Sequence, residues 1–299
     1  DGWVALENLR DGVAVAQVTE DGVSSFVVPS QVIRMPFSGE GVRMQSPQGK
    51  GWLDIWMTPD HRVLSYSRDG NPIWDTAQDW LDKWEGTKII DRKIRRGTQV
   101  LGGRVLTSDE RNTLELAVAS QADSSRSGGC WSIAVKKDRK LSRLRDLGVD
   151  VIYYPDREVG VGRVPREQVS EWVGEDKSFQ PDKILSLCAD DLDFFIRMVM
   201  LWDGDSTRSN TYCQHPDRSK DVDVVQAAAA LSGKSTSRYE YHRRDLNGDR
   251  VDTPYNTLNV NYTAVRCASR LNTSSEFFEG QVYCVTVPTG AFLIRSHGS

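Results

Sequence analysis

Thr58 and His61 lie three residues apart at the end of an apolar run, in the segment Asp54-Ile-Trp-Met-Thr-Pro-Asp-His-Arg-Val63. A threonine hydroxyl and a neutral imidazole N–H on one tight turn can both point at a single carbonyl oxygen. Donors in that position stabilise the negative charge that develops on the oxygen during attack on a peptide bond. A capping threonine followed by a turn histidine has the same spacing, so the pair alone leaves both interpretations open.

Cys284 lies in a second segment, Gly280-Gln-Val-Tyr-Cys-Val-Thr-Val-Pro-Thr-Gly-Ala-Phe-Leu-Ile-Arg295. Together the two segments resemble conserved blocks of inteins, the first the Thr-x-x-His block and the second the Val-Tyr-x-x-Thr-Val block near the C-terminal splice junction. The resemblance implies that Thr58 and His61 polarise the scissile amide and that Cys284 assists at the same site. The alternative interpretation of Cys284 is a buried strand cysteine.

Departures from the intein pattern change what this resemblance implies. Val63 stands where the class that uses the block cysteine as its first nucleophile has tryptophan, so we expect a first Cys or Ser upstream of this sequence. Gly290 and Ala291 stand where many inteins have His-Asn, and the sequence ends at Ser299 without the asparagine that cyclises. We therefore expect both splice junctions and the host-protein exteins to lie outside this sequence.

Asp123 and Asp203 each end an apolar segment with helical spacing. Residues 109–122 follow a cap-like Ser108, and residues 190–202 form a second apolar run that stops at Asp203-Gly204. Each predicted helix is followed by candidate strands, at 130–135 and 211–214, and by a further helix, at 140–147 and 221–231. This is an internal repeat. Because the helix dipole disfavours an acid at a C-terminus, the matched aspartates need another role.

The repeat resembles the LAGLIDADG homing endonucleases in Leu116-Ala-Val-Ala-Ser-Gln-Ala-Asp123 and Phe195-Ile-Arg-Met-Val-Met-Leu-Trp-Asp-Gly204. The resemblance implies paired helices whose acids, Asp123 and Asp203, hold Mg²⁺ over the scissile phosphates of double-stranded DNA. Two close carboxylates repel each other unless a divalent cation neutralises them, and such a cation can activate water. Ser124 replaces the usual glycine, and Met200 lies where small residues normally permit close helix contact. Both departures favour a decayed nuclease as the alternative.

Basic residues concentrate in one part of a chain whose formal net charge is −4. Between Lys88 and Arg145, 14 Lys and Arg stand against 6 Asp and Glu. A local basic face can supply contacts to phosphate, so the net acidity does not exclude DNA. The predicted DNA contacts are Arg92, Lys93, Arg95, Arg96, Lys136, Lys137 and Lys140. A solvated basic face is the alternative for any one of them.

The composition is that of a globular protein, with 38% hydrophobic and 27% charged residues. The five cysteines have no paired spacing, which argues against a disulfide framework and a zinc site. No apolar run reaches the length that spans a bilayer, and the first residues do not resemble a signal peptide. We therefore expect a cytoplasmic monomer that does not bind membranes.

Alternating residues predict strands at 12–18, 23–28 and 51–56, separated by Asp-Gly turns. The predicted fold class is α+β. An all-β HINT-type splicing domain, residues 1–75 and 270–299, is interrupted by a two-repeat α/β LAGLIDADG-like endonuclease domain, residues 76–269. The predicted function is an intein with an inserted site-specific DNA endonuclease. The alternative is a remnant, inactive in splicing and cleavage, that acts only as a DNA-binding or passive insertion.

Overall fold

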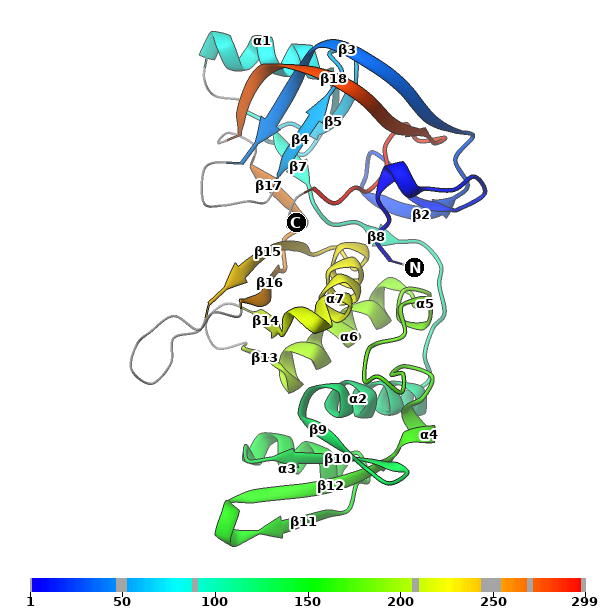
Figure 1. Cartoon of the computed structure of the whole chain (residues 1–299), viewed down its shortest axis with the longest axis vertical. Helices are drawn as coiled ribbons and strands as arrows, with labels where there is room; N and C mark the ends of the chain where they lie inside the picture. The colour runs from blue at the N-terminus through cyan, green and yellow to red at the C-terminus, as the bar shows by residue number, and fades with distance from the viewer. Residues whose placement is uncertain are drawn as a thin grey trace. The chain divides into compact units, whose positions relative to one another are not determined.

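The computed structural model describes residues 2–46, 53–87, 91–205, 210–242, 254–267 and 271–296, which form a mixed α+β architecture (Figure 1). The chain divides into two compact units. The strand-rich unit comprises Trp3–Leu101, Ala230–Tyr239 and Asn261–Ser299, and the repeat unit comprises Gly102–Ala229 and Glu240–Val260 with the first two residues. Each unit is described by itself.

The strand-rich unit contains one helix and ten strands among its described residues. They are β1 (Val15–Val18), β2 (Val23–Val27), β3 (Gln31–Gln45), β4 (Asp54–Met57), β5 (Arg62–Tyr66), β6 (Pro72–Thr76), α1 (Ala77–Thr87), β7 (Lys93–Arg95), β8 (Gln99–Val100), β17 (Val265–Cys267) and β18 (Asn272–Thr286). The sheets have the orders β1-β2-β8, β17-β7-β5-β6 and β18-β3-β4.

The longest pairing in this unit joins β3 to β18, drawn as the long blue and orange-red arrows of Figure 1. The two strands run antiparallel over fifteen residues each, with Gln45 opposite Asn272 and Gln31 opposite Thr286. Of these strands the sequence predicts only the C-terminal block that contains Cys284. The pairing joins residues more than 200 positions apart, so no local pattern indicates it.

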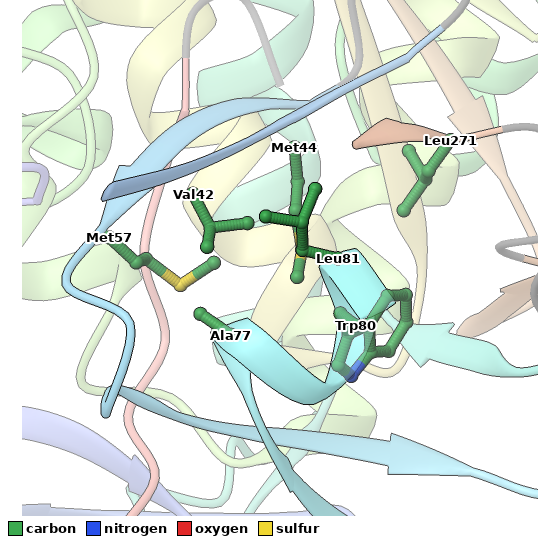
Figure 2. Close-up of a cluster of buried hydrophobic side chains, with 7 residues drawn as sticks. All are labelled: Val42, Met44, Met57, Ala77, Trp80, Leu81 and Leu271. Carbon is green, nitrogen blue, oxygen red and sulfur yellow. The ribbon is translucent and has the colours of Figure 1, made fainter. Parts of the chain in front are cut away.

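One face of the β18-β3-β4 sheet packs against α1 and forms a core (Figure 2). Its members are Val42, Met44, Met57, Ala77, Trp80, Leu81 and Leu271. Full burial of a side chain the size of Leu81 contributes about 1.5–3 kcal/mol, so α1 is anchored to this sheet. The predicted domain boundary at residue 76 therefore differs from the boundary between compact units. Residues 77–101 belong to the strand-rich unit because α1 supplies part of its core.

The repeat unit contains two successive helix–strand–helix segments. The first has α2 (Ser108–Asp123), β9 (Ser124–Ser127), β10 (Cys130–Val135), α3 (Asp138–Asp146), β11 (Val151–Tyr154), β12 (Val159–Pro165) and α4 (Arg166–Val169). The second has α5 (Pro181–Ile184), α6 (Ala189–Trp202), β13 (Gly204–Asp205), β14 (Thr211–Gln214), α7 (Ser219–Leu231) and β16 (Tyr255–Asn261). The first five residues of β15 (Ser235–Tyr241) belong to the strand-rich unit and its last two to the repeat unit. The two sheets have the orders β11-β12-β10-β9 and β13-β14-β16-β15.

The predicted repeat of helix, acid, strands and helix is confirmed in this unit. Both strand pairs start at the residue after the acid: Ser124 lies opposite Ile133, and Gly204 lies opposite Tyr212. The helix start differs from the prediction. Thr107, not Ser108, is the N-cap of α2, because it forms a capping box with Glu110.

No helix in the described ranges is long and apolar enough to cross a membrane.

Candidate active site

Helices α2 and α6 pack against each other and place their terminal aspartates in the same unit. Asp123 is the last residue of α2, and Asp203 is the C-cap of α6. Met200 is buried, 3% exposed, so its size has not kept α6 out of the packed interior. The sequence prediction that both helices deliver an acid at their ends is thus confirmed.

The residue after each acid explains one departure from the family pattern. A Cβ at Gly204 would lie 2.7 Å from Cα of Met200, so a side chain does not fit there. Ser124 instead follows Asp123 with extended backbone (φ −110°, ψ 161°), and its hydroxyl donates to the carbonyl of Ser120. The end of α2 therefore accommodates a serine side chain, whereas the end of α6 leaves room only for glycine.

Lys140 joins the ends of the two helices. Its ammonium donates to Oδ2 of Asp123 and to the carbonyl oxygen of Trp202. The residue is 8% exposed, and its Nζ lies 5.9 Å from the Trp202 ring centroid. The sequence predicts Lys140 as a DNA contact, which is corrected here: α3 points this side chain inward, where it neutralises Asp123.

Asp203 has a different environment. Oδ2 accepts a hydrogen bond from the side-chain amide of Gln214 on β14. Burial and, second, the negative charge of Asp123 raise the pKa of Asp203 to about 6, against the opposite effects of Lys140, Gln214 and Lys177. The two acids are therefore close enough to repel each other.

Lys177 is a second cation at this site, and it comes from the connection between the two repeats. Its Nζ donates to the carbonyl oxygen of Ser124 at 2.6 Å. Burial lowers the pKa of Lys177, as does the charge of Arg218, while Asp203 and Asp123 oppose this. The residue has φ of +67°, which lysine rarely adopts, in a tight turn closed by the bond from Lys177 N to Gly174 O.

Buried polar contacts hold the helices that carry the acids. Glu115 of α2 is fully buried and accepts from Arg143 Nε at 2.7 Å and from Trp202 Nε1 at 3.3 Å. Asp221 of α7 is also buried and accepts from the backbone N–H of Phe179 at 2.8 Å. Removing one partner of such a contact would leave a buried charge without compensation, which is strongly destabilising. These contacts therefore hold α2, α3 and α6 in a fixed arrangement.

Two carboxylates of this kind suit a hard divalent cation, which takes oxygen ligands. After burial, the negative charge of Asp123 is the second cause of the raised pKa of Asp203, and a divalent cation between the two would relieve that repulsion. Within the described ranges, no group of three or more His, Cys, Asp or Glu side chains is arranged to hold a metal. Two carboxylates supply fewer ligands than a hard divalent cation takes, so an ion held by Asp123 and Asp203 would need further oxygen ligands from water or substrate.

The other predicted DNA contacts are divided between the two units. Lys136 and Lys137 are exposed between β10 and α3 of the repeat unit. The four arginine and lysine residues from 92 to 96 lie in the strand-rich unit and already have partners there. Arg92 Nε lies 3.5 Å from Asp75, Lys93 donates to the Arg68 carbonyl at 2.6 Å, Arg95 lies over the Tyr66 ring, and Arg96 donates to the Thr236 carbonyl.

Thr58 and His61 form the predicted tight turn, in which His61 N donates to Thr58 O at 3.0 Å. Burial lowers the pKa of His61, so its imidazole is neutral at pH 7, as an oxyanion donor requires. A Cβ at Gly290 would lie 3.7 Å from Arg62, the residue after His61. Near Gly290, the C-terminal block thus lies beside the end of the Arg62 side chain.

Cys284 is not joined to that turn in the residues that the structure describes. It lies opposite Ile33 on β3, whereas Met57, the residue before Thr58, lies opposite Val42, nine positions along the same strand. Its Sγ lies 3.7 Å from the Val285 carbonyl, and burial raises the pKa of the thiol. No hydrogen bond joins Cys284 to Thr58 or His61 among these residues, so their shared site stays a prediction.

Sequence reasoning missed Lys177 and Gln214. Neither lies in a motif, and both reach the acids from segments whose course depends on the fold. Comparison of the two repeats offers one signal for Gln214. Ile133 lies opposite Ser124 in the first repeat, and Tyr212 lies opposite Gly204 in the second. Val135 and Gln214, each two positions farther along, are therefore counterparts. Alternate side chains of β14 are buried, and Gln214 is one of them. A polar residue at a buried position where the other repeat has valine indicates a special role.

No protein-family model matches the chain, and a search of curated proteins finds no match. Among solved structures, a crystal structure of I-DmoI in complex with DNA and calcium has 11% sequence identity and a TM-score of 0.33, covering 52% of this chain and 84% of that chain. A complex of I-DmoI with DNA and manganese has 10% identity and a TM-score of 0.33, covering 51% and 90%. Likeness this weak establishes neither a shared fold nor a shared function.

Proposed function

We propose that the repeat unit is a metal-dependent endonuclease that cuts double-stranded DNA at Asp123 and Asp203. The supporting observation is that the negative charge of Asp123 contributes to the raised pKa of Asp203 at the ends of paired helices. Lys140 contacts both helix ends, and Lys177 contacts the end of α2 at Ser124. Structural aspartates at helix ends gain nothing from such proximity, because each raises the cost of charging the other. A cation-binding role accounts for both.

Each side chain has a separate task in this proposal. Asp123 and Asp203 would hold the divalent ion, which when bound activates water and stabilises the leaving oxygen. Lys140 fixes the orientation of Asp123, and Gln214 fixes that of Asp203. Lys177 places a positive charge beside the acids, where it would attract a phosphate and stabilise its developing negative charge.

Cleavage of a duplex DNA library with a randomised central segment tests this function, because the target sequence is unknown. The full chain should cut a subset of sequences in Mg²⁺ and none in excess chelator. Asp203→Asn should lower cutting by about a hundredfold or more, since the metal supplies several kcal/mol of transition-state stabilisation. Asp146→Asn is the matched control, because Asp146 also ends a helix, α3, but lies at its exposed surface.

The outcomes separate the proposal from its alternative. Binding of DNA with no cutting in any divalent metal would support the inactive DNA-binding remnant. Cutting that Asp203→Asn leaves unchanged would show that another site carries the activity.

We also propose that the strand-rich unit is a HINT-type protein-splicing domain. The observation that favours it is the neutral, half-buried His61 on the Thr58 turn, with the C-terminal block beside Arg62. A chain extended on both sides to include the flanking host segments should ligate those segments. If the extended chain is recovered intact, with neither flank released nor joined, splicing is not its function.

A further inference from the structure

The β18-β3-β4 sheet of the strand-rich unit has a second face, opposite the core of Figure 2, that carries three aromatic rings. Phe37 on β3, Trp56 on β4 and Phe278 on β18 form a continuous row, which we call the aromatic platform. The ring centroids of Phe37 and Trp56 are 5.4 Å apart, and those of Trp56 and Phe278 are 4.7 Å apart. All three rings are partly exposed.

Strand alternation explains why the platform is separate from the core. Val42 and Met44 of β3 point to the face that α1 covers, so Gly41 and Arg43 lie on the other face. Trp56 alternates with Met57 in the same way. The rings therefore take no part in packing α1 against the sheet, and the fold already has its core without them.

Two of the rings lie directly over glycine residues of the sheet. A Cβ at Gly41 would lie 1.9 Å from Cζ2 of Trp56, and one at Gly280 would lie 2.9 Å from Cζ of Phe278. Both distances are shorter than real Cβ contacts allow, so only glycine lets these rings lie along the sheet. The missing side chains at Gly41 and Gly280 allow Trp56 and Phe278 to lie this close to the strands, and both rings stay partly exposed.

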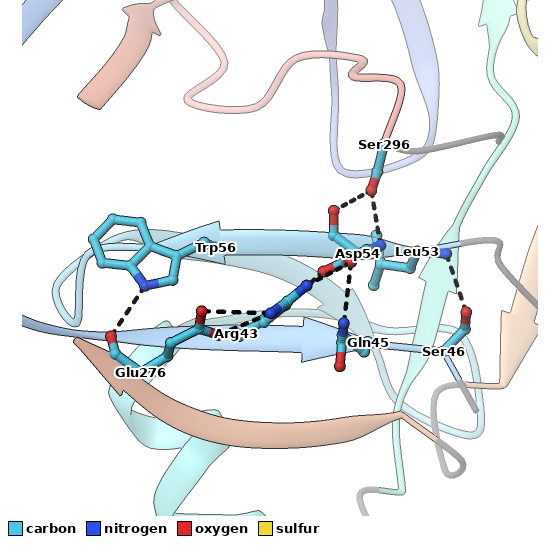
Figure 3. Close-up of polar contacts among 8 residues, drawn as sticks. All are labelled: Arg43, Gln45, Ser46, Leu53, Asp54, Trp56, Glu276 and Ser296. Atoms are coloured by element: carbon cyan, nitrogen blue, oxygen red, sulfur yellow. Dashed lines mark hydrogen bonds and ion pairs between the residues drawn. The ribbon is translucent and has the colours of Figure 1, made fainter. Parts of the chain in front are cut away.

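Charged groups lie beside Trp56 on this face (Figure 3). Arg43 donates to Asp54 at 2.9 Å and to Glu276 at 3.0 Å, and the Trp56 indole N–H donates to the Glu276 carbonyl at 3.2 Å. Two carboxylates and one guanidinium leave a formal charge of −1. The Glu276 side chain is 45% exposed, so it remains open to a further partner.

We propose that the aromatic platform binds an arginine side chain of a partner protein. The π-face of an indole carries negative potential and attracts a cation placed over it. A guanidinium can stack on Trp56 and donate in its plane to the Glu276 carboxylate, which an ammonium cannot do in both ways at once. The same negative potential repels phosphate, so this face is unsuited to nucleic acid. The inference does not depend on either function proposed above.

A short peptide tests the platform on the full chain. The probe is a blocked pentapeptide of alternating glycine and arginine, and its control replaces arginine with citrulline, which has nearly the same shape without the charge. Binding is followed by the NMR shift of the Trp56 indole N–H, which the Trp56→Leu variant identifies. We expect a saturable shift with arginine and at least about a threefold weaker one with citrulline, the range of an exposed cation–π contact.

Three variants assign the binding to this face. Because Trp56→Leu lacks the indole reporter, the variants are compared by the resonances of the peptide itself. Trp56→Leu and Glu276→Gln should each weaken binding of the arginine peptide about two- to fivefold, with an unchanged thermal midpoint for Glu276→Gln. Phe26→Leu is the matched control, because Phe26 is an aromatic residue of the same unit, 50% exposed on β2 and outside the platform. It should leave binding unchanged. Glu276→Gln keeps the test valid even where Trp56→Leu disturbs folding.

Several outcomes would overturn the inference. Equal affinity for the citrulline peptide would show that charge is not recognised. Equal losses in Phe26→Leu and Trp56→Leu would mean that the peptide binds aromatic residues without preference. A Trp56 shift caused by single-stranded DNA, or a dimer that Trp56→Leu dissociates, would assign the face to nucleic acid or to a second copy of the chain.

Discussion

The residues predicted to act together are coupled in the repeat unit but not in the strand-rich unit. Asp123 and Asp203 influence each other electrostatically, and Lys140 contacts both helix ends. Cys284 has no such link to Thr58 or His61 in the described residues, although Gly290 lies beside Arg62. The difference teaches that a repeat places matched residues together through symmetric helix packing. The turn after β4 and the C-terminal part of β18 are not related by such a repeat, so nothing in the sequence brings them together.

The largest expected effect concerns the predicted splicing site in the strand-rich unit. In a chain extended into its host segments, His61→Ala should slow the first acyl shift about a hundredfold, because a half-buried neutral imidazole is lost as a donor to the scissile carbonyl. Thr58→Ala should slow it less. The rate of branched or cleaved product measures both, and Arg62→Lys is a neighbouring control.

An unchanged rate with both Thr58 and His61 replaced would remove this turn from splicing. Cys284→Ala then sharpens the comparison. If Cys284 assists at the same site, its loss slows splicing in the extended chain, whereas a buried strand cysteine loses only stability, about 1 kcal/mol.

Lys177→Met tests whether the cation beside the acids acts in catalysis. We expect DNA cutting to fall about tenfold to a hundredfold, because a positive charge near the developing phosphate charge is lost. DNA binding should change little, since it depends on many phosphate contacts. Lys137→Met, at an exposed position, is the matched control; a larger loss of cutting there than in Lys177→Met would contradict this assignment.

Lys140→Met tests the connection between the helix ends. The variant leaves Asp123 Oδ2 and the Trp202 carbonyl without the ammonium, so we expect the free energy of unfolding to fall by about 1–3 kcal/mol. This loss of stability is smaller than the loss expected for a fully buried ion pair, because the Asp123 side chain is 31% exposed. Urea unfolding measures it. No loss of stability would mean that Lys140 is dispensable for joining α2 to α6.

The smallest expected effect is the pH dependence from Asp203. Its pKa is about 6 in the folded chain and 3.8 as the ordinary value, so between these values the folded state binds more protons than the unfolded state. Stability from this group therefore falls as pH rises from about 4 to 6 and stays reduced above 6. Asp203→Asn should remove that fall and gain on the order of 1–2 kcal/mol at pH 7. Identical pH profiles of the two proteins would contradict it.

The sequence predicts much of the repeat unit because its signals are local. Apolar spacing indicates α2 and α6 to within one or two residues, and the strands at 130–135 and 211–214 have the predicted bounds. The strand-rich unit depends on β3 pairing with β18, which no local pattern specifies. The sequence also misplaced Lys140 on the surface, because one lysine among three near α3 gives no sign that its side chain faces inward.

The candidate site shows the same division between local and distant information. Asp123 and Asp203 were found because each ends a periodic helix. Gln214 and Lys177 were not, since Gln214 acts from a strand and Lys177 from a turn whose positive φ no lysine pattern predicts. Their roles follow only once the fold brings these segments to the helix ends.

The most direct test of the central claim is metal binding itself, which needs no knowledge of the DNA target. Titration of the full chain with Mn²⁺, followed by electron paramagnetic resonance of the free ion, should reveal a site that Asp123→Asn and Asp203→Asn each weaken at least about tenfold. Asp146→Asn should not change it. Mn²⁺ affinity that is the same in the wild-type chain and in both site variants would contradict the account, because the two carboxylates would then hold no metal.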